Sequence, residues 1–146
     1  MSETSSRVIP MSYMGIPFSQ DPTGSRAAIL GIPFDCGTHP TRIGARQGPD
    51  AIRTQSSLVR PYYPPDFDFN PLELLNLVDC GNVACVAGEV ESAMTTIESA
   101  VSEICQAGAV PVTMGGDGSV TIGQLRALSG LYSDLAVLHV DSHTDA

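Results

Sequence analysis

Three side chains that commonly bind metal ions lie close together in the segment DSHTD, residues 141–145. Asp141, His143 and Asp145 alternate along it, and alternate residues of an extended segment share one side. Two carboxylates and an imidazole without a thiolate favour a Mn²⁺-type site over a structural zinc site. The segment is therefore a candidate metal site, and the alternative is a solvated loop after a strand, with no metal.

A second candidate segment is GGDGS, residues 115–119. Its glycines allow the backbone to approach a ligand or a neighbouring loop closely. The alternative interpretation is a tight strand-to-helix turn that is capped by Asp117 or Ser119. A phosphate-binding loop is excluded, because the GK[ST] signature is absent and all seven basic residues of the chain are arginines.

The segment 35–53 contains three arginines, Arg42, Arg46 and Arg53. They could bind an anion, but we favour a structural role in which forked hydrogen bonds to carbonyls hold a long loop. His39 has no partner at a useful spacing. His139 lies within an apolar run, and we expect it to be either a core histidine or one that supports a metal ligand from behind.

The functional segments lie between elements that alternate along the chain. Apolar runs predict strands, and apolar residues at steps of three and four predict helices. The expected strands are 27–32, 74–78, 110–114 and 135–140; the expected helices begin near Gly48, span 89–106 with Gly108 as the C-terminal cap, and follow Ser119. This order predicts an α/β fold with a parallel, doubly wound sheet, residues 1–25 forming an arm and 26–146 the domain.

In such sheets, ligands bind beyond the carboxyl ends of the strands. The loops after Ile32, Met114 and Val140 should therefore form the site. The charge distribution agrees, because twelve of the sixteen acidic residues lie in 61–146 whereas six of the seven arginines lie in 1–60. This acidic half is where we expect a cation to bind.

Composition excludes several classes of protein. With 146 residues, 42% of them hydrophobic, the chain can form the core of one domain and is not a disordered tail. A net charge of −9 without a basic cluster argues against nucleic acid and anionic membrane as partners. We expect no membrane span and no secretory signal, and free thiols in a reducing cytoplasm at the four cysteines, Cys36, Cys80, Cys85 and Cys105.

Three motifs in this order resemble the ureohydrolase family, which includes arginase, agmatinase and guanidino-acid hydrolases. They are GIPFDCGT (31–38), RIGARQGPDAIR (42–53) and LHVDSHTD (138–145). The motifs resemble those in the N-terminal half of proteins of the agmatinase-like branch. The resemblance implies a three-layer αβα fold of the arginase type, here truncated after about four strands. It also implies a binuclear manganese centre, a small guanidino substrate that is hydrolysed to urea and an amine, and a homo-oligomer, either trimer or hexamer.

By this resemblance Asp141 would bridge two manganese ions, Asp145 would complete one site and His143 the other. The family's GGDHS loop supplies a histidine where this chain has Gly118, next to Asp117. The family's later paired aspartates and its catalytic histidine have no counterpart, so we expect no catalytic residue within this chain. Two functions stay open: a manganese-dependent hydrolase of linear amidines, or a metal-poor, non-catalytic family member.

Overall fold

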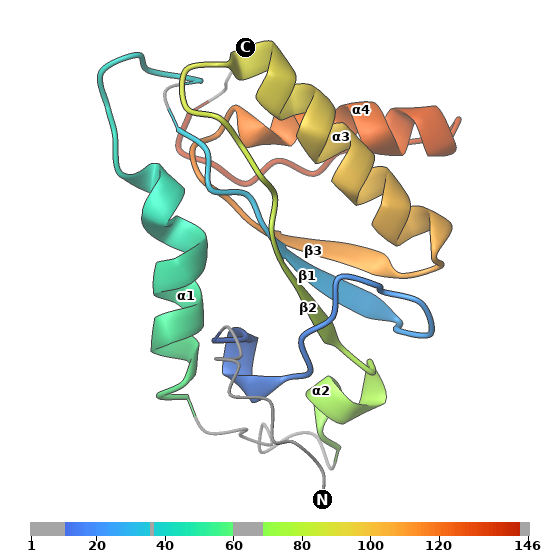
Figure 1. Cartoon of the computed structure of the whole chain (residues 1–146). Coiled ribbons are helices and arrows are strands. Elements are labelled where there is room, and N and C mark those ends of the chain that lie inside the picture. Colours follow the sequence, from blue (N-terminus) through green and yellow to red (C-terminus); the bar gives the residue numbers. More distant parts are fainter. Residues whose placement is uncertain (1–10, 36, 60–68, 144–146) are drawn as a thin grey trace, which may run out of the picture.

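The computed structural model describes residues 11–35, 37–59 and 69–143. Its centre is a parallel sheet of three strands: β1 (Ala27–Gly31), β2 (Val78–Asn82) and β3 (Val110–Met114). Their order is β2-β1-β3, so β1 lies between the other two (Figure 1). The carboxyl ends of all three strands therefore lie at one edge, as the α/β prediction requires.

Helices lie on both sides of this sheet (Figure 1). The long helices α3 (Val90–Gln106) and α4 (Val120–Leu131) pack on each other over one face. The other face is covered by α1 (Gly48–Ser56), α2 (Pro71–Leu74) and the short 3-10 helix η1 (Tyr13–Gly15). A second 3-10 turn, η2 (Ala45–Gln47), precedes α1. The result is the αβα layering expected for an arginase-type fold.

The central strand β1 is buried on both faces, as its apolar sequence predicts. Ala28 and Leu30 belong to the larger core, which α3 fills with Met94, Ile97 and neighbouring residues. Ala27 and Ile29, which alternate with them, belong to a smaller core on the opposite face. Because side chains alternate along a strand, four consecutive apolar residues supply both cores.

The prediction for α3 and β3 is confirmed. Helix α3 places Ala93, Met94, Ile97 and Val101 on its buried side, at steps of one, three and four. It ends before Gly108, whose φ of +82° is the left-handed conformation that glycine adopts readily after a helix. The strand β3 then begins at Val110, as expected.

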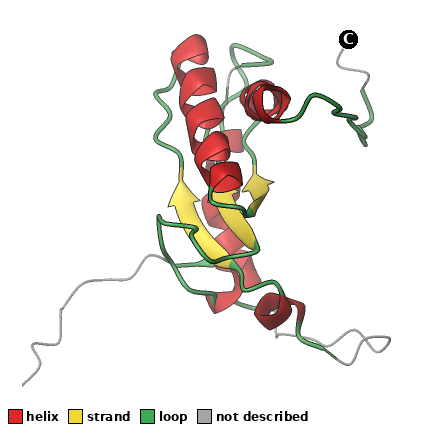
Figure 2. Ribbon diagram, turned by 90° about the vertical axis from the view of Figure 1, so that its right-hand side faces the viewer, coloured by secondary structure: helices red, strands yellow, loops and turns green. Residues whose placement is uncertain are grey.

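Two predicted strand positions are wrong. Residues 74–78 do not form one strand, because Asn70 caps a helical turn through a hydrogen bond from the Leu72 N–H (3.0 Å), and β2 begins only at Val78. Residues 135–140 form no strand either, and Leu138 is 91% exposed. Their sequence favours a strand, but a strand also needs a partner and cover. Figure 2 shows this segment leading away from the sheet.

The described part of the predicted arm runs beside β2. The Asp79 N–H donates to the Pro17 carbonyl (2.9 Å), and the Ser19 N–H donates to the Asp79 carbonyl (3.0 Å). This pairing is parallel and joins Phe18 to Asp79. Within residues 11–35, 37–59 and 69–143, no helix is both long and apolar enough to cross a membrane.

Candidate functional site

The loops that follow β1 and β3 are joined at the carboxyl edge of the sheet. The Gly116 N–H donates to the Ile32 carbonyl (2.9 Å), and the Asp117 N–H donates to the Phe34 carbonyl (3.0 Å). A Cβ atom on Gly116 would lie 1.7 Å from the Phe34 carbonyl oxygen. Only glycine therefore allows this close approach, which the glycine-rich sequence predicted as one of two possibilities.

Asp117 bonds on one side to the loop between β1 and η2, called the β1 loop below, and on the other side to the start of α4. Its Oδ2 accepts from the N–H groups of Gly37 (2.9 Å) and Thr38 (3.2 Å). Its Oδ1 accepts from the Ser119 N–H (3.1 Å) and hydroxyl (2.5 Å). Burial alone would raise the pKa of Asp117, but these hydrogen bonds outweigh it and hold the pKa below its usual value.

Asp35 closes the other end of the β1 loop. Its buried carboxylate accepts the Gly44 N–H (2.7 Å) and the Arg46 Nε–H (2.9 Å), and it forms an ion pair with the Arg46 guanidinium. The Arg46 side chain and the Gly44 N–H hold the pKa of Asp35 well below its usual range. Arg46 therefore has a structural role, as predicted, but it binds a carboxylate, whereas carbonyls were expected.

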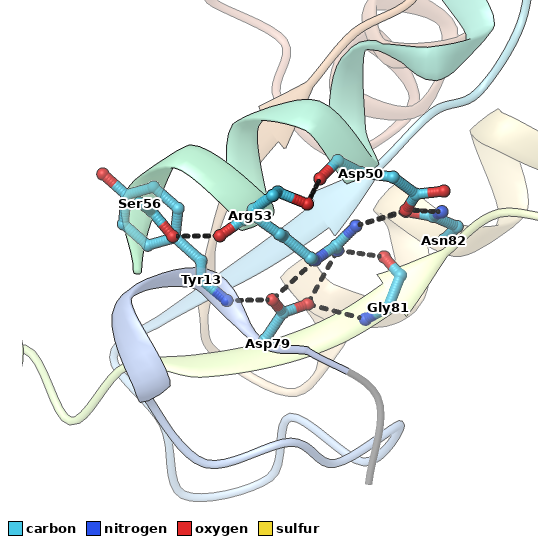
Figure 3. Close-up of polar contacts among 8 residues, drawn as sticks. Tyr13, Asp50, Arg53, Ser56, Asp79, Gly81 and Asn82 are labelled. Atoms are coloured by element: carbon cyan, nitrogen blue, oxygen red, sulfur yellow. Dashed lines mark hydrogen bonds and ion pairs between the residues drawn. The ribbon is translucent and has the colours of Figure 1, made fainter. Parts of the chain in front are cut away.

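Arg53 and Asp79 form a second buried ion pair, between α1 and β2 (Figure 3). Arg53 Nε and Nη2 donate to the two carboxylate oxygens of Asp79, both at 2.8 Å. Asp79 also accepts the Tyr13 N–H (2.8 Å), and the Met14 N–H donates to Ser56 Oγ (2.8 Å). The pair thus fixes α1, β2 and η1 together, which confirms a structural role for Arg53.

A cavity of about 430 Å³ opens beside the joined loops. The β1 loop contributes Gly37 and Thr38 to its lining, and the β3 loop contributes Gly118 and Ser119. The remaining lining residues are Thr121, Ile122, Leu125, Val137 and His139. Of the two roles expected for His139, the core role is wrong, because its segment does not enter the sheet and its side chain is exposed. The role behind a metal ligand stays a prediction.

The predicted metal-binding segment is bent rather than extended. The His143 N–H folds back onto Asp141 Oδ1 (2.8 Å), and His143 Nδ1 lies 3.2 Å from the same oxygen. A short carboxylate readily accepts the N–H two residues ahead, and this bond lowers the pKa of Asp141. The structure thus brings Asp141 and His143 together, whereas Asp145 lies outside the described residues.

The described residues supply only part of a binuclear manganese centre. Asp141 and His143 are donors that Mn²⁺ accepts, but Gly118 offers no side-chain donor. Among the residues that the structure describes, no three His, Cys, Asp or Glu side chains gather as a metal would require. The described donor set is therefore sufficient for part of one ion's coordination only.

Asp35, Asp79 and Thr38 were missed by the sequence analysis as residues that build the site. The signal for the two aspartates was their position, since each comes directly after or shortly after an apolar run: Asp35 follows β1, and Asp79 lies near the start of β2. Thr38 gave no signal, because its place in the cavity depends on Asp117, 79 residues away. Of the four cysteines, Cys36 lies outside the described residues; burial raises the pKa of the other three, which are free thiols.

Comparisons with known proteins identify relatives that belong to a single family. The Arginase family model matches residues 25–146. Proclavaminate amidinohydrolase of Streptomyces clavuligerus is 35% identical over 136 residues, which are 92% of this chain and 42% of that protein. The human mitochondrial guanidino acid hydrolase is also 35% identical, over 92% of this chain and 38% of its own length. The chain thus spans about two fifths of the length of these curated relatives.

Solved structures of related enzymes superpose on most of this chain. Proclavaminate amidinohydrolase superposes with a TM-score of 0.86, covering 95% of this chain and 45% of that chain. The formiminoglutamase of Trypanosoma cruzi, solved with Mn²⁺, superposes with a TM-score of 0.70 at 29% identity, over 84% of this chain and 42% of that one. The partial coverage fits the match to half of a family domain that the motifs predicted.

Proposed function

The chain belongs to the Arginase family, and from this premise we propose that the protein hydrolyses the guanidino group of a small linear amidine to urea and an amine. Agmatine and guanidino acids are the two candidate substrates. Both kinds of hydrolase occur among the relatives of similar identity, including a guanidinobutyrase of Pseudomonas aeruginosa and an agmatinase of chicken. Identity alone therefore does not choose between them.

The observation that carries the proposal is the cavity at the carboxyl ends of β1 and β3. Its volume of about 430 Å³ suits a small linear substrate. Ile122 and Leu125 offer apolar contacts for a methylene chain, and Thr38 and Thr121 offer hydroxyl groups for a polar end. The cavity also lies where ligands bind in parallel α/β sheets.

Mn²⁺ is the cofactor that we propose for the protein. Asp141 and His143 are suitable donors for it, and a related formiminoglutamase was solved with Mn²⁺. Asp141 and His143 would hold part of its coordination, and such an ion would activate a water as the nucleophile. In the loop after β3, Gly118 offers no side-chain donor and Asp117 orients the backbone through its hydrogen bonds. The free thiols of Cys80, Cys85 and Cys105 support a cytoplasmic location.

Urea release tests the proposal directly. The natural protein in its full length is assayed with agmatine and with 4-guanidinobutyrate in the presence of Mn²⁺. We expect urea from at least one substrate and its loss in Asp141→Ala. Asp134→Ala, a change at an exposed aspartate in the same part of the chain, is the matched control and should keep activity. Equal urea release by the wild type and Asp141→Ala would contradict the proposal.

A metal-poor, non-catalytic family member is the second candidate function. The specific observation in its favour is Gly118, which lines the cavity without a donor side chain. On this alternative, the protein releases no urea from either substrate even at saturating Mn²⁺. The same assay therefore separates the two candidates.

A further inference from the structure

We propose that Asp117 is a positioning residue that acts through Thr38, and that the Thr38 hydroxyl contacts the guanidino group of the substrate. This inference rests on the proposed function for its substrate. It adds two residues to the site that the metal-binding pattern does not contain. It also assigns a task to the loop between β1 and α1, which the motifs alone do not explain.

The first observation is that one carboxylate holds two loops. Asp117 Oδ2 accepts the Gly37 and Thr38 N–H groups, and Asp117 Oδ1 accepts both donors of Ser119. Ser119 directly precedes α4, so the β1 loop is tied to the start of a helix that packs extensively on α3. A rigid element thereby sets the position of Thr38.

The second observation concerns the Thr38 hydroxyl. The N–H of Thr38 is used by Asp117, and its side chain lines the cavity. Among the described residues, the hydroxyl is bonded to none, because the only hydrogen bond that Thr38 makes there is through its N–H. A hydroxyl oxygen is an acceptor, whereas a guanidinium carries only N–H donors. The two groups are therefore complementary.

The third observation is that the loop is fixed at both ends. Asp117 binds its start at Gly37 and Thr38, and Asp35 binds its end at Gly44 and Arg46. Residues 37–45 are exposed, Thr38 among them, so these bonds rather than burial hold the loop. Fixing the ends restricts the backbone of Thr38 before a ligand arrives, and such preorganisation lowers the entropy lost on binding.

A double-mutant cycle on the full-length natural protein tests the coupling. We expect Thr38→Val, which keeps the shape but removes the hydroxyl, to raise KM for 4-guanidinobutyrate or agmatine about tenfold, as for one hydrogen bond to a charged group. Asp117→Asn should raise KM comparably. The double variant should be within about twofold of the worse single variant, because both changes remove the same contact.

Thr121→Val is the matched control for the cycle. Thr121 lines the same cavity, but it lies on α4 and no bond to the Asp117 side chain holds it. Its effect on KM should therefore multiply with that of Asp117→Asn. If the effects of Thr38→Val and Asp117→Asn also multiply, in a protein that releases urea, our inference is wrong and the proposed function stands. If the wild type releases no urea, the proposed function itself is contradicted.

Amide hydrogen exchange of the 146-residue chain tests the positioning without a substrate. We expect the Gly37 and Thr38 amides to exchange at least about tenfold faster in Asp117→Ala than in the wild type, since both amides lose their acceptor. Ser119→Ala removes a bond on the other carboxylate oxygen and should leave these two rates unchanged. Equal rates at Gly37 and Thr38 in Asp117→Ala and the wild type would overturn the positioning role.

Discussion

Arg53 and Asp79 carry opposite charges in the interior, with side chains 6% and 0% exposed. Replacing one partner leaves the other as an uncompensated buried charge. We therefore expect Arg53→Met to lower the free energy of unfolding by about 3–5 kcal/mol. Arg126→Met is the control, because its ion pair with Glu91 is exposed and should contribute at most about 1 kcal/mol. Urea denaturation measures both, and similar losses in the two variants would contradict this role for Arg53.

The buried carboxylate of Asp79 should also make stability depend on pH. Burial alone would raise the pKa of Asp79, but bonds from Arg53, Tyr13 and Gly81 hold it below the unfolded value of 3.8. Between the folded and the unfolded pKa of Asp79, the unfolded chain binds more protons than the folded chain. The contribution of Asp79 to stability is therefore fully present above about pH 4 and is lost as the pH falls. Asp79→Asn should show a shallower acid decline in denaturant titrations. An unchanged slope would argue against the paired Asp79.

At the scale of elements, local sequence patterns were sufficient to predict β1 and α3, whose buried positions follow a regular spacing. The strand β1 and the helix α3 carry apolar residues at the spacing that their two environments require, so sequence predicted both. The start of β2 was misplaced because Asn70 and Pro71 begin a helical turn ahead of it. The run 135–140 has a strand's composition, but composition does not reveal whether a neighbouring strand is present.

The exposed run 135–140 makes a further expectation testable. Leu138 is 91% exposed, whereas Ile32, beyond the end of β1, is 0% exposed. We expect Leu138→Asp to change the free energy of unfolding by less than about 0.5 kcal/mol. Ile32→Asp, the buried counterpart, should unfold the chain because it buries an unpaired charge. Thermal unfolding followed by circular dichroism measures both, and a large loss for Leu138→Asp would mean that this run packs as a strand.

At the scale of the whole molecule, the site combines segments that are far apart in sequence. The carboxyl-end rule predicted that the loops after β1 and β3 meet. It did not predict that Asp117 bonds to Gly37 and Thr38, because a single sequence carries no record of such long-range pairs. The rule was wrong for the loop after Val140, because residues 135–140 form no strand. The alternation of residues along 141–145 placed Asp141 and His143 together, but it assumed an extended backbone where a bend brings the two side chains into contact.

Metal stoichiometry follows from the donor set as a whole. Asp141 and His143 contact each other and Gly118 contributes no side chain, so the 146-residue chain should retain at most one Mn²⁺ ion after dialysis against trace metal. Loss of supporting groups lowers metal affinity about 10–100-fold. Elemental analysis measures the ratio of metal to protein, with Asp141→Ala as the blank. Two firmly held ions per chain would contradict the incomplete donor set.

The measurement that most directly tests our account is urea release against Mn²⁺ concentration for the full-length natural protein and its Gly118→His variant. The proposed guanidino hydrolase site lies beside residue 118 and lacks one metal donor there. We therefore expect Gly118→His to raise both the affinity for Mn²⁺ and the rate at limiting metal, by about tenfold or more. Asp141→Ala should be inactive in either background. A glycine form that is fully active at trace Mn²⁺, or a histidine form with an unchanged titration, would contradict the account.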